Sequence, residues 1–106
     1  MINEMFKLIK EIDEVGSQLN SVKSELRKKE FDLKCLKSEM EFSSEYEDFR
    51  EGLKVKEIPP KILEETKSQS EEICDLKSKR DDLEHELYVL KLQFDYTKEV
   101  IDNKKQ

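Results

Sequence analysis

The chain has 106 residues, of which 35% are hydrophobic and 43% are charged, and its formal net charge at pH 7 is −6. So little apolar material excludes a large globular core, and the chain can fold only if its apolar residues share a narrow seam. The negative charge disfavours a general role in coating nucleic acid or anionic lipid, and no run approaches the ~18 apolar residues of a membrane span.

The chain begins with Met1 and ends in a polar tail, so we expect a complete small protein with one domain over residues 1–106. Its 2 Gly and 2 Pro, together with abundant Leu, Lys and Glu, are typical of long helices. The first residues are too charged for a signal peptide. We therefore expect a soluble protein in the cytoplasm or otherwise inside the cell.

Apolar residues recur at spacings of 3 and 4 through the first 40 residues, which is the heptad pattern of a coiled-coil helix. One seam series is Met5, Ile12, Leu19, Leu26, Leu33 and Met40, and the other is Leu8, Val15, Val22, Lys29, Leu36 and Ser43. The stripe then continues out of register through Phe42, Tyr46, Phe49 and Leu53. We expect a first helix over about residues 3–51.

A hinge follows the first helix. Gly52 can end a helix in the left-handed conformation, and Pro59-Pro60 disfavours helix at the residue before it. We expect an extended linker over about residues 52–59. The alternating apolar and charged residues that begin at Leu53 leave open a short strand at 53–58 that pairs with another copy.

A second helix is expected over about residues 60–103. Its seam series are Ile62, Gln69, Leu76, Leu83, Leu90 and Thr97, and Thr66, Ile73, Arg80, Leu87, Phe94 and Ile101. Toward its end, further apolar residues widen the stripe beyond a two-helix seam: Tyr88, Val89, Leu92, Tyr96 and Val100. One partner helix cannot cover that arc.

These patterns predict an all-α fold, in which two long helices form an antiparallel coiled-coil hairpin that is assembled into a larger helical bundle. The surplus apolar surface near the chain ends predicts a homo-oligomer, a dimer or larger, or a complex with another helical protein. The residues that we expect in this oligomer interface are Met5, Phe6, Ile9, Leu87, Leu90, Phe94, Tyr96 and Ile101.

Two charged residues stand at seam positions and can fix the register of the hairpin. If the hinge lies where expected, Lys29 falls opposite Asp81 and Asp82, and Arg80 falls opposite Glu30 and Asp32. The residues assigned to register setting are therefore Lys29, Arg80, Asp82 and Glu30. The same register places Phe94 and Tyr96 beside Gly16, where a missing side chain leaves room for a ring.

Residues 39–51 hold six acidic residues, one basic residue and three interleaved aromatic residues. Acidic and exposed aromatic side chains together are typical of a binding surface for a basic partner. The candidate partner-binding residues are Glu41, Phe42, Glu45, Tyr46, Asp48 and Phe49. The alternative is a solvated helix face whose aromatic residues close the hinge end of the hairpin.

No motif indicates catalysis, a cofactor or a metal site, and a two-helix hairpin encloses no pocket, so we do not expect an enzyme. The single His85 falls on the solvent side of its helix. Cys35 and Cys74 stand alone, without a second ligand at metal-binding spacing, and their heptad positions diverge too far for a disulfide.

The leading functional prediction is a coiled-coil protein–protein interaction or oligomerisation module. One alternative is a small acidic inhibitor or adaptor, of the kind encoded by bacteria and phages, that imitates nucleic acid and binds a basic nucleic-acid-processing protein. A second alternative is a helical nucleic-acid-binding accessory factor, based on Arg27-Lys28-Lys29 and the lysines around them. The negative net charge makes nucleic acid the less favoured partner.

Overall fold

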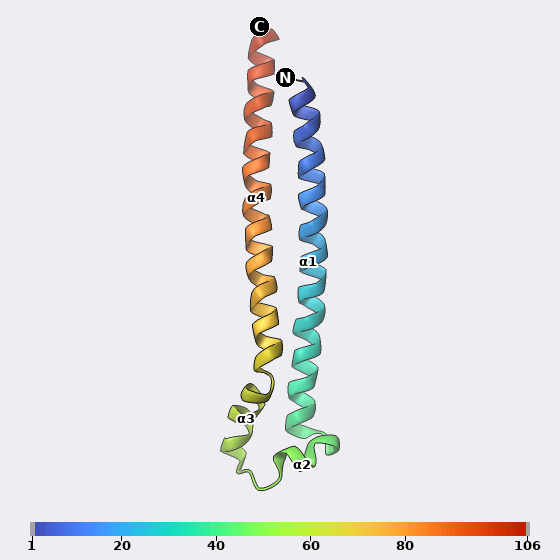
Figure 1. Cartoon of the computed structure of the whole chain (residues 1–106), viewed down its shortest axis with the longest axis vertical. Helices are drawn as coiled ribbons and strands as arrows, with labels where there is room; N and C mark the ends of the chain where they lie inside the picture. The colour runs from blue at the N-terminus through green and yellow to red at the C-terminus, as the bar shows by residue number, and fades with distance from the viewer. Residues whose placement is uncertain (1, 106) are drawn as a thin grey trace. The chain divides into compact units, whose positions relative to one another are not determined.

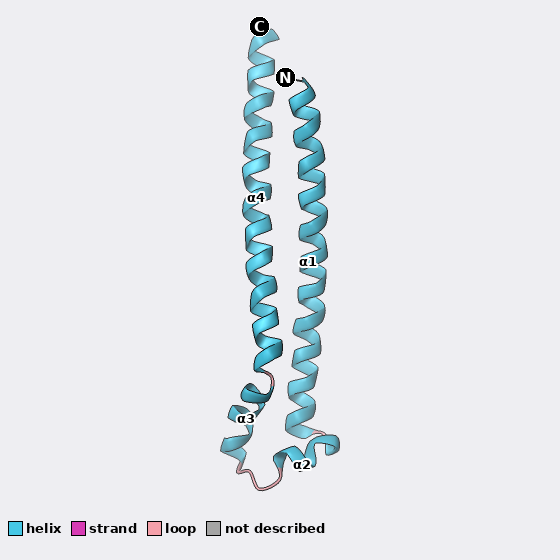
Figure 2. Cartoon of the chain, in the orientation of Figure 1, coloured by secondary structure: helices cyan, strands magenta, loops and turns pink. Residues whose placement is uncertain are grey.

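A computed structural model describes residues 2–105, which are helical apart from short turns and contain no strand (Figures 1 and 2). The long helices are α1 (Ile2–Phe42) and α4 (Lys67–Lys105). Between them lie the 3₁₀ turn η1 (Ser44–Tyr46), the short helix α2 (Glu47–Arg50), the 3₁₀ turn η2 (Val55–Glu57) and helix α3 (Ile58–Glu65).

The chain divides into two compact units, and both contain parts of the two long helices. Unit 1 comprises Met1–Lys23 and Ser78–Gln106, and unit 2 comprises Ser24–Lys77 with the hinge. Helix α1 packs on α4, as in a helical hairpin. In unit 1, Leu8 shares a groove with Gln93, and Lys23 pairs with Glu84. The residue numbers on α4 therefore fall as those on α1 rise.

The buried residues of both units belong to the seam series predicted from the sequence. In unit 1 they are Val15, Leu19, Val22, Leu83 and Leu90, and in unit 2 they are Leu26, Met40, Ile62, Thr66 and Ile73. Their spacing places them on one stripe of each helix, because residues 3 or 4 apart share a helix face. The periodic part of the sequence therefore locates the core correctly.

The first long helix ends at Phe42 and not near residue 51 as expected. Ser43 has an extended backbone, with φ −76° and ψ 145°, and its hydroxyl accepts a hydrogen bond from the Glu45 backbone N–H at 3.2 Å. A serine that bonds a nearby backbone N–H offers the chain an alternative to helix, which explains the early end. The aromatic stripe after Met40 lies on η1 and α2.

The hinge is shorter than the expected linker over 52–59. Gly52 has a φ of 76° and follows α2, so its predicted left-handed conformation is confirmed. Only Leu53 and Lys54 are extended or irregular before η2, and the residues 53–58 form no strand. Helix α3 already begins at Ile58, because prolines are well tolerated in the first turn of a helix, where Pro59 and Pro60 lie.

The expected second helix is divided at Thr66 into α3 and α4. Thr66 is fully buried and leaves helical geometry, with φ −103° and ψ 13°. Its hydroxyl donates to the Ile62 carbonyl at 2.7 Å, and its backbone N–H donates to the same oxygen at 2.9 Å. The Ile62 carbonyl thus gives the buried Thr66 hydroxyl a hydrogen-bond partner. The spacing of apolar residues alone does not predict this bond or the break in the helix.

No aromatic ring of the described residues packs against Gly16, although the sequence register placed Phe94 and Tyr96 beside it. A Cβ placed at Gly16 meets nothing within 4 Å. Tyr96 is 69% exposed, and Phe94 is half-buried. The glycine therefore has no packing role, and its helix cost is uncompensated.

Candidate interaction surfaces

The acidic and aromatic segment folds into the hinge end of unit 2. Phe49 and Tyr46 are half-buried and pack edge to face, with ring centroids 6.4 Å apart. The Lys61 ammonium lies over the Phe49 ring, 4.5 Å from its centroid, and donates to the Phe49 carbonyl at 3.0 Å. Two of the three predicted aromatic anchors are thus engaged within unit 2.

Arg50 connects the same segment to the end of α1. Its guanidinium donates to the Met40 carbonyl at 2.8 Å and to the Ser43 carbonyl at 2.7 Å. The last carbonyls of a helix have no partner inside the helix, and Arg50 supplies one. Sequence reasoning missed Arg50 and Lys61 as structural residues, because neither belongs to the series of apolar residues that predicts the helix seam.

The remaining predicted partner-binding residues lie at the surface. Phe42 is 75% exposed, and Glu41, Glu45 and Asp48 are exposed as well. This leaves a single fully available aromatic side chain beside the acidic residues. The arrangement fits the alternative prediction, in which aromatic residues close the hinge end, better than a surface with three aromatic anchors.

The predicted oligomer interface residues all lie in unit 1 but differ in exposure. Leu90 is buried inside the unit, and Met5, Leu87, Phe94 and Ile101 are half-buried along the seam. Phe6, Ile9 and Tyr96 are exposed and remain available to a partner. The seam is therefore less completely covered near Met5 than at Leu19, which is only 5% exposed.

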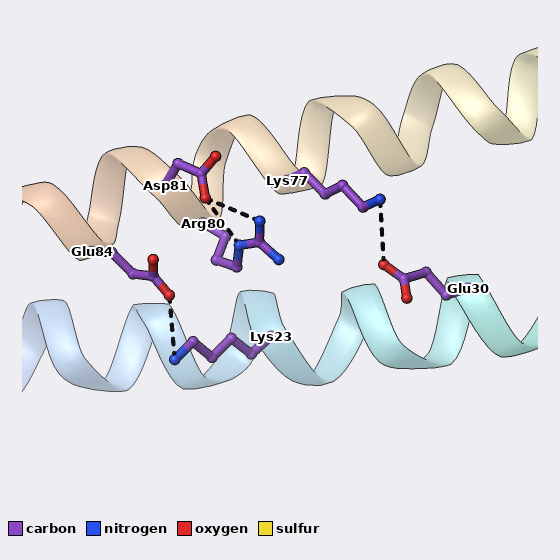
Figure 3. A network of polar contacts seen from close by, with 6 residues as sticks. All are labelled: Lys23, Glu30, Lys77, Arg80, Asp81 and Glu84. Atoms are coloured by element: carbon purple, nitrogen blue, oxygen red, sulfur yellow. Dashed lines mark hydrogen bonds and ion pairs between the residues drawn. The ribbon is translucent and has the colours of Figure 1, made fainter.

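The charged residues form partners other than those expected from the sequence register. Lys29 binds the Glu72 carboxylate, not Asp81 or Asp82. Arg80 pairs with the adjacent Asp81 at 3.1 Å (Figure 3). The expected pairings of Lys29 and Arg80 were wrong, because Glu72 lies more than two helical turns before Asp82 along α4, so α1 and α4 pack in another register than the one inferred from the sequence.

Two further ion pairs join α1 and α4, one in each unit (Figure 3). Lys23 pairs with Glu84 at 3.5 Å in unit 1, and Glu30 pairs with Lys77 at 4.0 Å in unit 2. Glu30 was expected opposite Arg80, and its partner Lys77 lies about one helical turn before Arg80 on α4. Asp82 and Asp32 are exposed.

The Glu72 carboxylate changes the pKa of Lys29. Its hydrogen bond to the Lys29 ammonium, reinforced by Coulomb attraction, raises the pKa of Lys29 above the ordinary 10.5, while burial acts in the opposite direction. The pair links α1 to α4 in unit 2, although both side chains remain partly exposed to solvent.

No similar protein was found. The chain matches no protein-family model, no curated protein and no solved structure.

Cys35 and Cys74 are free, exposed thiols, and His85 is exposed. Among the described residues, no three His, Cys, Asp or Glu side chains are grouped so that they could hold a metal ion. In the same part of the chain, no helix is long and apolar enough to cross a membrane.

Proposed function

We propose that the protein is a non-enzymatic interaction and oligomerisation module: an antiparallel coiled-coil hairpin whose unit 1 associates with further helices in a larger bundle. The observation that carries this proposal is the concentration of exposed large apolar side chains in unit 1. They are Ile2, Phe6, Ile9, Tyr88, Val89, Leu92 and Tyr96, whereas unit 2 has Phe31, Phe42, Val55 and Leu63.

Exposed apolar side chains on helix faces favour association because their burial removes apolar surface from water. The half-buried seam residues Met5 and Phe94 support the same conclusion, since a partner helix can complete their burial. The heptad pattern favours helices as the partners.

Sedimentation equilibrium from 5 µM to 1 mM tests the proposal. We expect a reversible oligomer, and a Phe6→Glu/Leu92→Glu variant that stays helical but becomes monomeric. Phe42→Glu is the matched control, because it introduces the same charge at an exposed aromatic residue of unit 2 and should leave association unchanged. A monomeric parent chain at 1 mM would contradict self-association. In that case, the proposed function would require a complex with another helical protein that is lost in the Phe6→Glu/Leu92→Glu variant.

A second candidate function is an acidic adaptor that binds a basic protein through the hinge end. The exposed Phe42 beside Glu41 and Glu45 favours it. A nucleic-acid-binding factor has less support, since Lys23 and Lys29 are paired with Glu84 and Glu72. Phe42→Ala would weaken the adaptor's complex and leave a coiled-coil assembly intact.

A further inference from the structure

The exposed face of α4 in unit 1 carries one continuous row of side chains. An α-helix turns about 100° per residue, so residues at the positions of this row lie within an arc of about 80°. All seven are exposed, and we call them the outer row: Asp81, His85, Tyr88, Leu92, Tyr96, Glu99 and Asn103. The buried Leu83 and Leu90 lie on the opposite side of the helix, so the outer row faces away from the seam with α1.

The outer row is symmetric about Leu92. In both directions from Leu92 it steps by 4, then 3, then 4 residues. The first step reaches Tyr88 on one side and Tyr96 on the other. The second step reaches His85 and Glu99, and the third reaches Asp81 and Asn103. The two residues of each pair cannot meet within one helix, but they can contact each other favourably when they belong to two copies of α4.

This spacing makes the row complementary to itself when two copies of α4 lie antiparallel with a two-fold axis at Leu92. Leu92 then meets Leu92 of the second copy, and Tyr88 meets Tyr96 of the second copy. His85 meets Glu99, and a histidine ring donates an N–H to a carboxylate in both its neutral and its charged form. A parallel arrangement would instead place Glu99 against Glu99.

We propose that the outer row of α4 is an antiparallel homodimer interface whose two-fold axis passes through Leu92. The inference rests on the proposed function and names a second copy of this chain as the partner. Tyr88, Leu92 and Tyr96 are 61%, 51% and 69% exposed, so they are available for the contact. One helix from each copy gives a small interface, for which weak association in the micromolar range is expected.

Directional cross-linking tests the antiparallel arrangement. In a background with C35S and C74S, unlabelled Tyr88→Cys chains are mixed with ¹⁵N-labelled Tyr96→Cys chains and oxidised gently. We expect disulfide-linked dimers of one light and one heavy chain well above the one-half share of random pairing. Light–light and heavy–heavy dimers in excess, or an absence of cross-linked dimers, would overturn the proposal.

Affinity measurements test the individual contacts. Leu92→Glu should raise the dimer Kd at least ~100-fold, because two leucines leave the interface in each dimer. His85→Glu should raise it about 3- to 10-fold by opposing Glu99, and the swapped variant His85→Glu/Glu99→His should restore it. Circular dichroism confirms that each variant remains helical.

Phe31→Glu is the matched control, since Phe31 is 65% exposed on α1 but lies in unit 2 and outside the outer row, so it should leave the dimer Kd unchanged. If Phe6→Glu abolishes the dimer and Leu92→Glu does not, the proposed association holds while this interface is wrong. If the parent chain remains monomeric at 1 mM, both self-association and this interface fail.

Discussion

Gly16 and Gly52 show how differently two glycines of one chain contribute to stability. Gly16 lies inside α1, whereas Gly52 has a φ of 76°, and an added Cβ meets nothing within 4 Å at either position. Steric crowding is therefore the same, and only backbone conformation distinguishes them. Gly16→Ala should stabilise the fold by up to ~1 kcal/mol, because alanine loses less entropy in a helix.

Gly52→Ala serves as the matched control and should destabilise the fold by about 1–2 kcal/mol, because an L-residue is strained at positive φ. Urea unfolding followed by circular dichroism measures both changes. A loss of stability in Gly16→Ala would show that a neighbouring group does occupy the space beside α1.

The pKa of Lys29 gives a second prediction at the scale of single residues. The folded protein holds the Lys29 proton more tightly than the unfolded chain, because Glu72 raises this pKa above 10.5. The resulting stability is fully present below pH 10.5 and is lost as the pH rises through the folded pKa. Glu72→Gln should return the pKa toward 10.5, as measured by NMR titration of ¹³C-labelled lysine side chains.

The same variant should unfold more readily than the parent chain between pH 7 and 10 and should match it at higher pH. An unchanged Lys29 pKa in Glu72→Gln would contradict the assigned cause. Sequence reasoning identified Lys29 as a charged seam residue but not its partner, because the register was inferred from a hinge over residues 52–59, whereas α1 already ends at Phe42 and Lys29 meets Glu72.

At the scale of elements, periodicity predicted the two long helices and the residues they bury, such as Leu19 and Leu83. It did not predict where the helices end. Those limits depend on local hydrogen bonds of Ser43, Arg50 and Thr66, which compete with regular helix bonding. The spacing of apolar residues does not predict such bonds. The aromatic residues after Met40 were therefore assigned to the first long helix, whereas Tyr46 and Phe49 lie on η1 and α2.

The outer row of α4 belongs to the same scale. The sequence indicated that Tyr88, Leu92 and Tyr96 widen the apolar arc, and the structure leaves all three exposed. The symmetry about Leu92 was present in the sequence as well. The exposure of Asp81, His85 and Glu99 on the same helix makes these residues available, together with the apolar ones, for contact with a second copy.

Arg50 should stabilise the end of α1 through its two carbonyl contacts. Arg50→Met removes both hydrogen bonds from a partly buried position, so we expect a loss of about 1–3 kcal/mol. Arg50→Lys should recover only part of this, because one ammonium lacks the forked geometry of a guanidinium. Lys28→Met, at an exposed position, is the control and should change stability by less than ~0.5 kcal/mol. Equal effects of Arg50→Met and Lys28→Met would contradict the capping role.

At the scale of the whole molecule, net charge separates the two candidate functions. Every copy carries −6 at pH 7, so two copies repel each other at long range, whereas a basic partner is attracted. Added salt screens both effects, since the Debye length falls from about 30 Å at 0.01 M to about 10 Å at 0.1 M. The direction of the salt dependence therefore reports which kind of association occurs.

We expect the dimer Kd to fall about 2- to 5-fold when KCl is raised from 0.01 M to 0.1 M, because screening of the repulsion between two −6 chains exceeds the weakening of the short His85–Glu99 contacts. Glu45→Gln/Asp48→Asn reduces the charge from −6 to −4 by removing two carboxylates from unit 2, whereas the outer row belongs to unit 1. Its dimer should be tighter at low salt and less sensitive to KCl. A parent-chain Kd that rises with salt would mean that oppositely charged surfaces drive the association, as a partner docked on the acidic hinge end would require.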